Sequence, residues 1–268
     1  MIDAHRLSSD MVPTAESPFS QVFDRLFSCV HSSAIEHFGA FYSSELGGIV
    51  THPAFHILHM DDHLVHRGHA VFDTALITDG YIYQLPQHVE RFAISAASAG
   101  ISLPVSNEAL MRIILDTAAA SKKSNGIVKF WASSGRGGYA LSPSECIEPN
   151  IYAVATSENT EPIDRTLGWK ACPSPIPPKA APFGRIKSNN YLQNVLALTQ
   201  AQSDGMDVGI FVDDKGFILE GPNSNFGLLT QDNVFVTPPF DNCLAGITVQ
   251  RLMEIIPPVS PAWFLHTS

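Results

Sequence analysis

Histidine is the most frequent residue in the stretch HILHMDDHLVHRGHAVFDT, which begins at position 56. His56, His59, His63 and His66 are spaced three, four and three residues apart, so they would share one face of a helix. Imidazoles gathered on one face are frequent ligands of transition metals. A metal site is therefore the first chemistry to weigh, and the alternative is that these histidines are packing residues.

Lys187 is a second candidate for chemistry. It lies in FGRIKSNNYLQNVLA, just before a predicted helix and in an otherwise apolar stretch. Most lysines are solvated, so a surface position is the default interpretation. A partly desolvated lysine, however, has a lowered pKa and can form a Schiff base with an aldehyde. The other motifs of the sequence must decide between a surface lysine and a Schiff-base lysine.

Two later segments place other reactive groups in order after Lys187. In FILEGPNSNFG, Glu220 ends a predicted strand and is followed by a Gly-Pro turn, where most carboxylates are surface groups. Beside a pyridine nitrogen, the same carboxylate would keep that nitrogen protonated. In CLAGITVQRLMEI, Gly246, Ile247 and Thr248 open a predicted helix, whose free N–H groups could bind an anion. The alternative is a plain N-cap by Thr248.

In this order, the segments resemble the fold-type IV pyridoxal-phosphate enzymes, which include branched-chain and D-amino-acid aminotransferases and aminodeoxychorismate lyases. HRGHAVFDTALITDGYIYQLPQHVERF is similar to the family's opening segment and RIKSNNYLQNVLA to its Schiff-base lysine segment. ILEGPNSNFG resembles its segment with the pyridine-nitrogen glutamate, and AGITVQRL its phosphate helix. The resemblance covers roughly residues 40–255, and four motifs in register are far more specific than one.

The resemblance implies a role for each matched position. Lys187 would be the Schiff-base lysine and proton shuttle, and Glu220 the partner of the ring nitrogen of pyridoxal 5'-phosphate. The other implied cofactor-binding residues are Arg91, Ile247 and Thr248 at the phosphate and Tyr191 near the ring hydroxyl. A homodimer that binds an amino acid and an oxo acid is also implied, with the cofactor between two domains.

Substrate contacts are implied for three further residues. Arg136 and Tyr139, in SGRGGYALSP, would lie in a loop that faces substrate, and Phe72 replaces a tyrosine of D-amino-acid aminotransferases. The family's opening segment is a turn and a strand, and a strand alternates its faces. The histidines are therefore predicted to pack rather than to bind a metal. His69, beside Gly68, is the one best placed to touch substrate.

The elements that must position these residues do not form a regular repeat. The pattern predicts a helix in SQVFDRLFSCVHSSAIEHF and a hairpin at Asp79-Gly80. Helices then follow in HVERFAISAASAG, closed by Gly100, and in NEALMRIILDTAAASK, capped by Asn107. IVKFWAS and IYAVATS are predicted strands, and the second half adds a helix after Lys187, the strands GIFVDDKGFILEG and NVFVTPPF, and the helix GITVQRLMEII.

This order is α+β. With the resemblance, it predicts a two-domain fold-type IV enzyme with a sandwich-like N-terminal domain and a pseudo-barrel C-terminal domain. The expected parts are a tail and helix over 1–38, an α+β domain over 39–157, a linker over 158–163, and a cofactor-binding domain over 164–268.

Composition narrows the function classes. The chain is 45% hydrophobic and 16% charged, as in ordinary globular proteins, and its formal net charge of -10 disfavours a nucleic-acid surface. Its four cysteines stand far apart without a CxxC pair, which favours free thiols in a reducing compartment. No apolar run reaches the roughly 20 residues of a membrane span, and the first eighteen residues show no signal peptide. A cytoplasmic location is predicted.

The C-terminus differs from the family pattern. Family members usually continue for some tens of residues past the phosphate helix, whereas this sequence stops at Ser268. Exposed strand edges and a partly open pocket are expected from that difference. Three interpretations stay open: an aminotransferase of the D-amino-acid or branched-chain type, an aminodeoxychorismate lyase that yields 4-aminobenzoate, and a non-catalytic paralogue.

Overall fold

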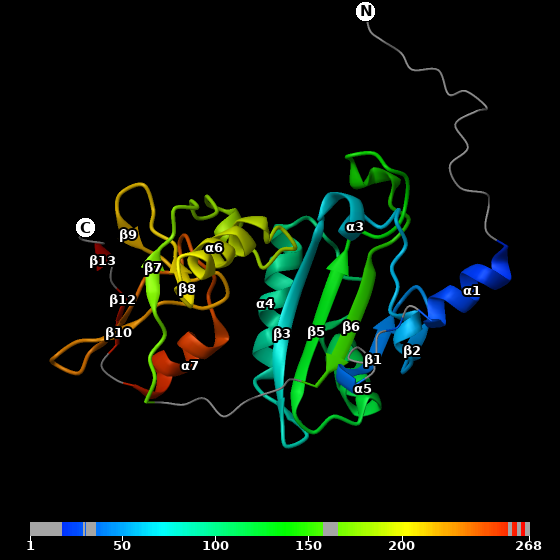
Figure 1. Cartoon of the computed structure of the whole chain (residues 1–268), viewed down its shortest axis with the longest axis horizontal. Helices are drawn as coiled ribbons and strands as arrows, with labels where there is room; N and C mark the ends of the chain where they lie inside the picture. The colour runs from blue at the N-terminus through cyan, green and yellow to red at the C-terminus, as the bar shows by residue number, and fades with distance from the viewer. Residues whose placement is uncertain are drawn as a thin grey trace, which may run out of the picture.

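A six-stranded antiparallel sheet forms the centre of the first half of the chain. The computed structural model describes residues 18–28, 30, 36–157, 166–256, 259–261 and 264–265. The strand order is β2-β1-β6-β5-β3-β4, and every neighbouring pair is antiparallel. The strands are β1 (Phe38–Ser43), β2 (Gly48–Val50), β3 (Ala70–Thr78), β4 (Tyr81–Ile82), β5 (Gly126–Ser133) and β6 (Asn150–Thr156). Figure 1 shows β3, β5 and β6 side by side.

Two helices, α4 (Leu85–Ser98) and α5 (Asn107–Ser121), cover one face of this sheet. In α4, Leu85, Val89, Phe92 and Ala96 are buried at intervals of three and four residues, so they form one apolar stripe. In β5, burial alternates along the strand, which places every second side chain under the helices. The main core therefore lies between the sheet and these helices, and the other face stays available for a site.

The second half of the chain consists of short elements. They are β7 (Ala171–Pro173), η3 (Phe183–Arg185), α6 (Leu192–Ser203), β8 (Val208–Ile210), β9 (Phe217–Ile218), β10 (Leu228–Leu229), β11 (Phe235–Thr237) and α7 (Ile247–Ile255). The terminal strands β12 (Val259–Pro261) and β13 (Phe264–Leu265) pair with β11 and β9. Strands β9 and β11 thus each have a partner at an edge that the sequence predicts to be exposed. Elsewhere lie α1 (Phe19–Ser28), η1 (Pro53–Phe55), α3 (His63–Arg67) and η2 (Pro143–Glu145).

Several local predictions are confirmed. Asp79 and Gly80 both have positive φ, 50° and 82°, and they join β3 to β4 as a two-residue hairpin turn. Gly100, with φ of 70°, follows the end of α4. The predicted linker over 158–163 lies outside the described residues. None of the helices in the described part of the chain is long and apolar enough to cross a bilayer.

Two local predictions are wrong. The cap of α5 is Ser106, whose hydroxyl accepts a hydrogen bond from the Ala109 N–H at 3.3 Å, and Asn107 is the first helical residue. The opening segment is not only turn and strand, because α3 is helical. Asp62 caps it by accepting the Leu64 N–H at 2.8 Å, and Gly68 ends it in the left-handed region.

The cap assignment gives a stability prediction. Ser106→Ala should lower the free energy of unfolding by about 1 kcal/mol, because it removes the hydroxyl that satisfies a first-turn N–H. Asn107→Ala should cost less, since alanine is the better helix former at a helical position. Urea denaturation of the two variants would check this, and a larger loss in Asn107→Ala than in Ser106→Ala would show that the cap is assigned to the wrong residue.

Candidate active site

A cavity of about 900 Å³ lies beside β3, between the first half of the chain and the second half. Its walls include one side from β3 and β5, one from α4, and one from the segments that contain Lys187 and Glu220. The structure brings most of the predicted site residues to this one cavity: Phe72, Arg91, Lys187, Tyr191, Glu220, Ile247 and Thr248.

The backbone of Lys187 is fixed to the first half of the chain. Its carbonyl accepts the Phe72 N–H at 2.9 Å, and its N–H donates to the Ser95 hydroxyl at 3.2 Å. The ammonium lies 3.4 Å from the Tyr191 hydroxyl and 4.8 Å from the centroid of the Phe72 ring. Burial, followed by the nearby Arg91, lowers the pKa of Lys187 to about 8. A free amine, the nucleophilic form, is therefore accessible close to neutral pH.

The pKa of Glu220 is shifted in the opposite direction from that of Lys187. Burial raises the pKa of its carboxyl group to about 7, although the Leu244 N–H and the nearby lysines oppose the shift. One carboxylate oxygen accepts hydrogen bonds from Leu244 N at 3.2 Å and from Asn225 Nδ2 at 3.3 Å. The carboxyl group is thus held in place and is poised between its two protonation states near neutral pH.

Arg91 is anchored by a buried carboxylate that the sequence analysis did not single out. Its Nε and Nη2 donate to Asp73 at 2.9 and 2.7 Å, and His88 Nδ1 lies 2.9 Å from the same carboxylate. Burial opposes ionisation of Asp73, but the bonds from His88 and Arg91 outweigh it and lower the pKa. Arg91 Nη1 donates to the Ala245 carbonyl at 3.3 Å. Of its five N–H groups, two remain for a ligand within the described structure.

Helix α7 begins at the same place. Gly246 is its N-cap and offers no side chain to the first-turn N–H groups of Ile247 and Thr248. A side chain here would displace Asn225, because a Cβ on Gly246 would lie 1.8 Å from the Asn225 amide oxygen. Uncapped N–H groups, the positive end of the helix and Arg91 together favour an anionic group such as a phosphate. Thr248 is therefore not the N-cap.

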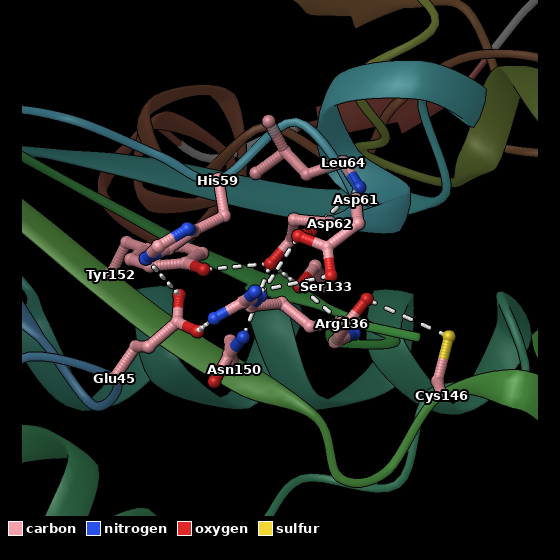
Figure 2. Close-up of polar contacts among 11 residues, drawn as sticks. Glu45, His59, Asp61, Asp62, Leu64, Ser133, Arg136, Cys146, Asn150 and Tyr152 are labelled. Carbon is pink, nitrogen blue, oxygen red and sulfur yellow. Dashed lines mark hydrogen bonds and ion pairs between the residues drawn. The ribbon is translucent and has the colours of Figure 1, made fainter. Parts of the chain in front are cut away.

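Arg136 and Tyr139 are not brought to this cavity. Figure 2 shows the Arg136 guanidinium beside the carboxylates of Asp61 and Glu45, and the shortest distances are 2.8 and 2.5 Å. Tyr139 is exposed, and its ring packs against His66 at 5.3 Å between centroids. The ion pairs hold the guanidinium away from the cavity, so neither Arg136 nor Tyr139 lines it, and their substrate contacts stay a prediction.

Asp62 explains why the loop containing Arg136 lies where it does. This fully buried carboxylate accepts hydrogen bonds from the Ser133 and Tyr152 hydroxyls at 3.0 and 2.7 Å and from Asn150 Nδ2 at 3.1 Å. Figure 2 shows this cluster next to the ion pairs of Arg136. The ends of β5 and β6 are therefore joined to the opening segment through one side chain. No local pattern encodes such a contact, since its members are separated by 71 to 90 positions.

Three of the histidines, His63, His66 and His69, pack against one another at a different place. His63 and His66 share the single turn of α3, with ring centroids 4.9 Å apart. His69, the predicted substrate contact, instead lies 2.9 Å from the Ser134 hydroxyl and 2.8 Å from the Ala99 carbonyl, and it does not line the cavity. In the described parts of the chain, no three His, Cys, Asp or Glu side chains gather as metal ligands would.

Sequence reasoning also missed Lys179, which lines the cavity with Lys187. Nothing in its proline-rich surroundings marks a functional lysine. Asp73 and His88 could have been found, since an aspartate at an inward position of an apolar strand needs a partner. His88 and Arg91 are spaced three apart on one helix face, which supplies two such partners.

Comparison with known proteins gives the class. The family model described as amino-transferase class IV matches residues 70–261. The chain is 44% identical over 221 residues to the protein named D-amino-acid transaminase, chloroplastic, of Arabidopsis thaliana, covering 82% of this chain and 59% of that one. It is 29% identical over 229 residues to a bifunctional aminodeoxychorismate lyase / D-amino acid transaminase of Mycobacterium tuberculosis, covering 78% and 76%.

The fold matches as well. A branched-chain amino acid aminotransferase from Thermobaculum terrenum, solved in its PLP form, superposes with a TM-score of 0.75 at 16% identity, covering 86% of this chain and 78% of that one. The chain belongs to the class IV aminotransferase family. The resemblance drawn from the four motifs and the α+β, fold-type IV architecture are thus confirmed. The chain spans 59% of the length of its Arabidopsis relative.

The raised pKa of Glu220 predicts a pH-dependent gain in Glu220→Gln. Ionised Glu220 costs stability when its folded pKa of about 7 exceeds the ordinary value of 4.5. The cost is absent below that value, grows as the pH rises and is complete above pH 7. Without cofactor, Glu220→Gln should therefore be more stable than the parent at about pH 8, by at most about 3 kcal/mol, and nearly equal at about pH 5.

Thermal melts at the two pH values would measure this difference. Glu90→Gln, which removes an exposed carboxylate of α4, is the matched control and should show no such pH dependence. Equal gains at both pH values, or a loss at the higher one, would mean that Glu220 is not held as a costly buried charge.

Proposed function

We propose that the protein is a pyridoxal-phosphate-dependent aminotransferase that moves an amino group between an amino acid and an oxo acid. The observation that supports this most is that one cavity gathers Lys187, Glu220, Arg91 and the start of α7. These are the four groups that such a cofactor needs: an amine for the aldehyde, a carboxylate for the ring nitrogen, and two donors for the phosphate. The residues present fit the cofactor.

The bound cofactor supplies an aldehyde and a pyridine ring that withdraws electrons from the α-carbon of the substrate. With the cofactor bound, Lys187 would be the amine that holds the aldehyde, with loss of water; once the substrate amine has taken its place, the freed Nζ would take and return the α-proton of the amino acid. Its lowered pKa suits both tasks. Glu220 holds a proton at the ring nitrogen, and Tyr191, whose pKa burial raises to about 12, stays a hydrogen-bond donor. Arg91 and the N–H groups of Ile247 and Thr248 hold the phosphate.

Two further proposals concern the domains and the oligomeric state of the protein. We infer two domains, over 39–157 and 164–268, because the cavity is lined from both sides of that division. We also infer a homodimer. The loop with Arg136 leaves Tyr139, Leu141 and Ile147 exposed, at 62%, 82% and 88%, and a second copy could cover this apolar surface. Arg136 and Tyr139 keep their predicted substrate role only if such an assembly places them at a cavity.

The D-amino-acid type of aminotransferase is favoured by the 44% identity to the Arabidopsis transaminase, with the branched-chain type second. Turnover with D-alanine or L-leucine as the amino donor and 2-oxoglutarate as the acceptor separates the two. The compartment is proposed as the cytoplasm. Since the Arabidopsis relative is named chloroplastic, a fluorescent fusion of the full chain in plant cells would test that assignment.

A lyase that forms 4-aminobenzoate is the second candidate, because the Mycobacterium tuberculosis relative is named for both activities. The distinction lies in the amino acceptor. Transamination stops after one half-reaction unless an oxo acid is added, whereas the lyase completes its cycle on aminodeoxychorismate alone. Product formation without any oxo acid would favour the lyase, and a strict requirement for one favours the aminotransferase.

The proposed function predicts the fate of Lys187. After incubation with pyridoxal phosphate and reduction with borohydride, peptide mass spectrometry should find the cofactor on Lys187 in the parent chain. Lys187→Arg should lose both this label and aminotransferase activity, because a guanidinium does not act as a nucleophilic amine at neutral pH. Lys215→Arg, at an exposed turn, is the control and should behave as the parent. A parent labelled elsewhere, or an active Lys187→Arg, would refute the assignment.

Arg91 should contribute to cofactor affinity. A single Arg91→Ala change would leave Asp73 buried and charged without its main partner, so we expect it to destabilise the fold as well. The double variant Asp73→Asn/Arg91→Gln removes both charges together. It should bind pyridoxal phosphate roughly ten- to a hundredfold more weakly, as loss of a charge-assisted bond implies. Fluorescence titration measures this, with Arg185→Gln as an exposed control. Unchanged affinity in the double variant would remove Arg91 from the phosphate site.

A further inference from the structure

Lys179 is a second lysine in the cavity, and the proposed function assigns it no task. Its Nζ lies 4.4 Å from the centroid of the Tyr191 ring. Lys187 Nζ donates to the hydroxyl of the same tyrosine and lies 5.9 Å from its centroid. Two ammonium groups therefore lie against one aromatic side chain within a single cavity.

The fold sets the position of Lys179. The turn after it is closed by hydrogen bonds from the N–H groups of Phe183 and Gly184 to the Ala180 carbonyl, at 2.8 and 3.3 Å. This turn packs closely, because a Cβ on Gly184 would lie 2.5 Å from the Asn242 carbonyl oxygen and 3.2 Å from that of Lys179. The backbone of Lys179 is thus held in one position beside the cavity.

The carboxylate in the cavity and the one buried next to it are committed to other groups. Asp73 on β3 is bound by Arg91 and His88, and Glu220 accepts from Asn225 and from a backbone N–H. Within the described residues, no carboxylate lies within the 4.0 Å ion-pair distance of either lysine. The charged and titratable side chains that line the cavity with Lys187 are Arg91 and His88 from α4, Lys129 from β5, Tyr191, Glu220 and Lys179.

We propose that Lys179 is a positioning residue for the aminotransferase reaction: its ammonium, held against Tyr191 in the cavity that also contains Lys187, is a fixed positive charge that disfavours the protonated form of Lys187. This inference rests on the proposed function. Two like charges in one cavity repel each other, so the more deeply buried of the two lysines, Lys187, loses its proton first.

The pKa of Lys187 is shifted in the direction that this arrangement requires. It is lowered first by burial, then by Arg91 and least by Lys179, while Asp73 and Glu220 oppose the shift. Burial lowers the pKa of Lys179 as well, and Glu220 opposes that change. Removing the charge of Lys179 should therefore raise the pH at which Lys187 becomes a free amine.

The test measures the reactivity of Lys187 directly and requires no cofactor. The full chain, stripped of bound small molecules, is treated with a trace of acetic anhydride over a range of pH, and peptide mass spectrometry reports acetylation of Lys187. In Lys179→Met and Lys179→Gln, the pH midpoint of this reaction should rise by roughly half a unit. Lys179→Arg, which keeps the charge, should retain the parent midpoint, as should the exposed control Lys215→Met.

An unchanged midpoint in both neutral variants would overturn the proposal. So would a shift in Lys179→Arg as large as in Lys179→Met, because the charge would then be irrelevant and only the amine or its shape would matter. Failure of the proposed function has a separate signature. A parent chain that takes up no pyridoxal phosphate on Lys187 refutes the aminotransferase, whereas an unchanged midpoint refutes only the role of Lys179.

Discussion

The buried ion pair between Asp73 and Arg91 is the interaction on which the candidate site depends. Asp73 lies on β3, Arg91 on α4, and the guanidinium also donates to the Ala245 carbonyl next to α7. Burying two charges is expensive, and this pair is stable because the carboxylate also accepts from His88 and from the Thr74 N–H, at 2.9 and 2.7 Å. Loss of one partner from such a pair typically costs about 3–5 kcal/mol. The same contacts that stabilise the fold thus aim a cation at the start of α7.

Burial also explains why the acid and the base of the site titrate close together. It raises the pKa of Glu220 to about 7 and lowers that of Lys187 to about 8, because in each case it disfavours the charged form. Ordinary values for these groups are 4.5 and 10.5. The pKa values of the two groups ordinarily differ by six units, and in this cavity they differ by about one. Both groups can therefore gain or lose a proton near neutral pH. Lys179 adds to the effect on Lys187 without itself being a reactant.

Much of the fold could be predicted because local patterns decide it. The hairpin at Asp79-Gly80 follows from the need for positive φ at both turn positions, and α4 follows from its apolar stripe. The cap of α5 was missed by one residue, because Ser106 and Asn107 are both good caps and only the backbone of the folded chain selects between them. Helix α3 was missed since it is a single turn, stabilised by its two caps rather than by periodicity.

The site residues that could be predicted from the sequence are those whose positions follow from the periodicity of a strand or a helix. On β3, Asp73 points into the core and its neighbours Phe72 and Thr74 point into the cavity, because successive side chains of a strand face opposite sides. One strand thus supplies both the buried carboxylate of the ion pair and a wall of the cavity. A slip of one residue in its pairing with β5 would exchange the two faces and place a charged aspartate in the cavity. The register of β3 is therefore fixed at once by the core and by the site.

Lys179 has no such constraint. Its place depends on how a proline-rich turn packs against Asn242, a contact between distant residues that sequence patterns do not specify.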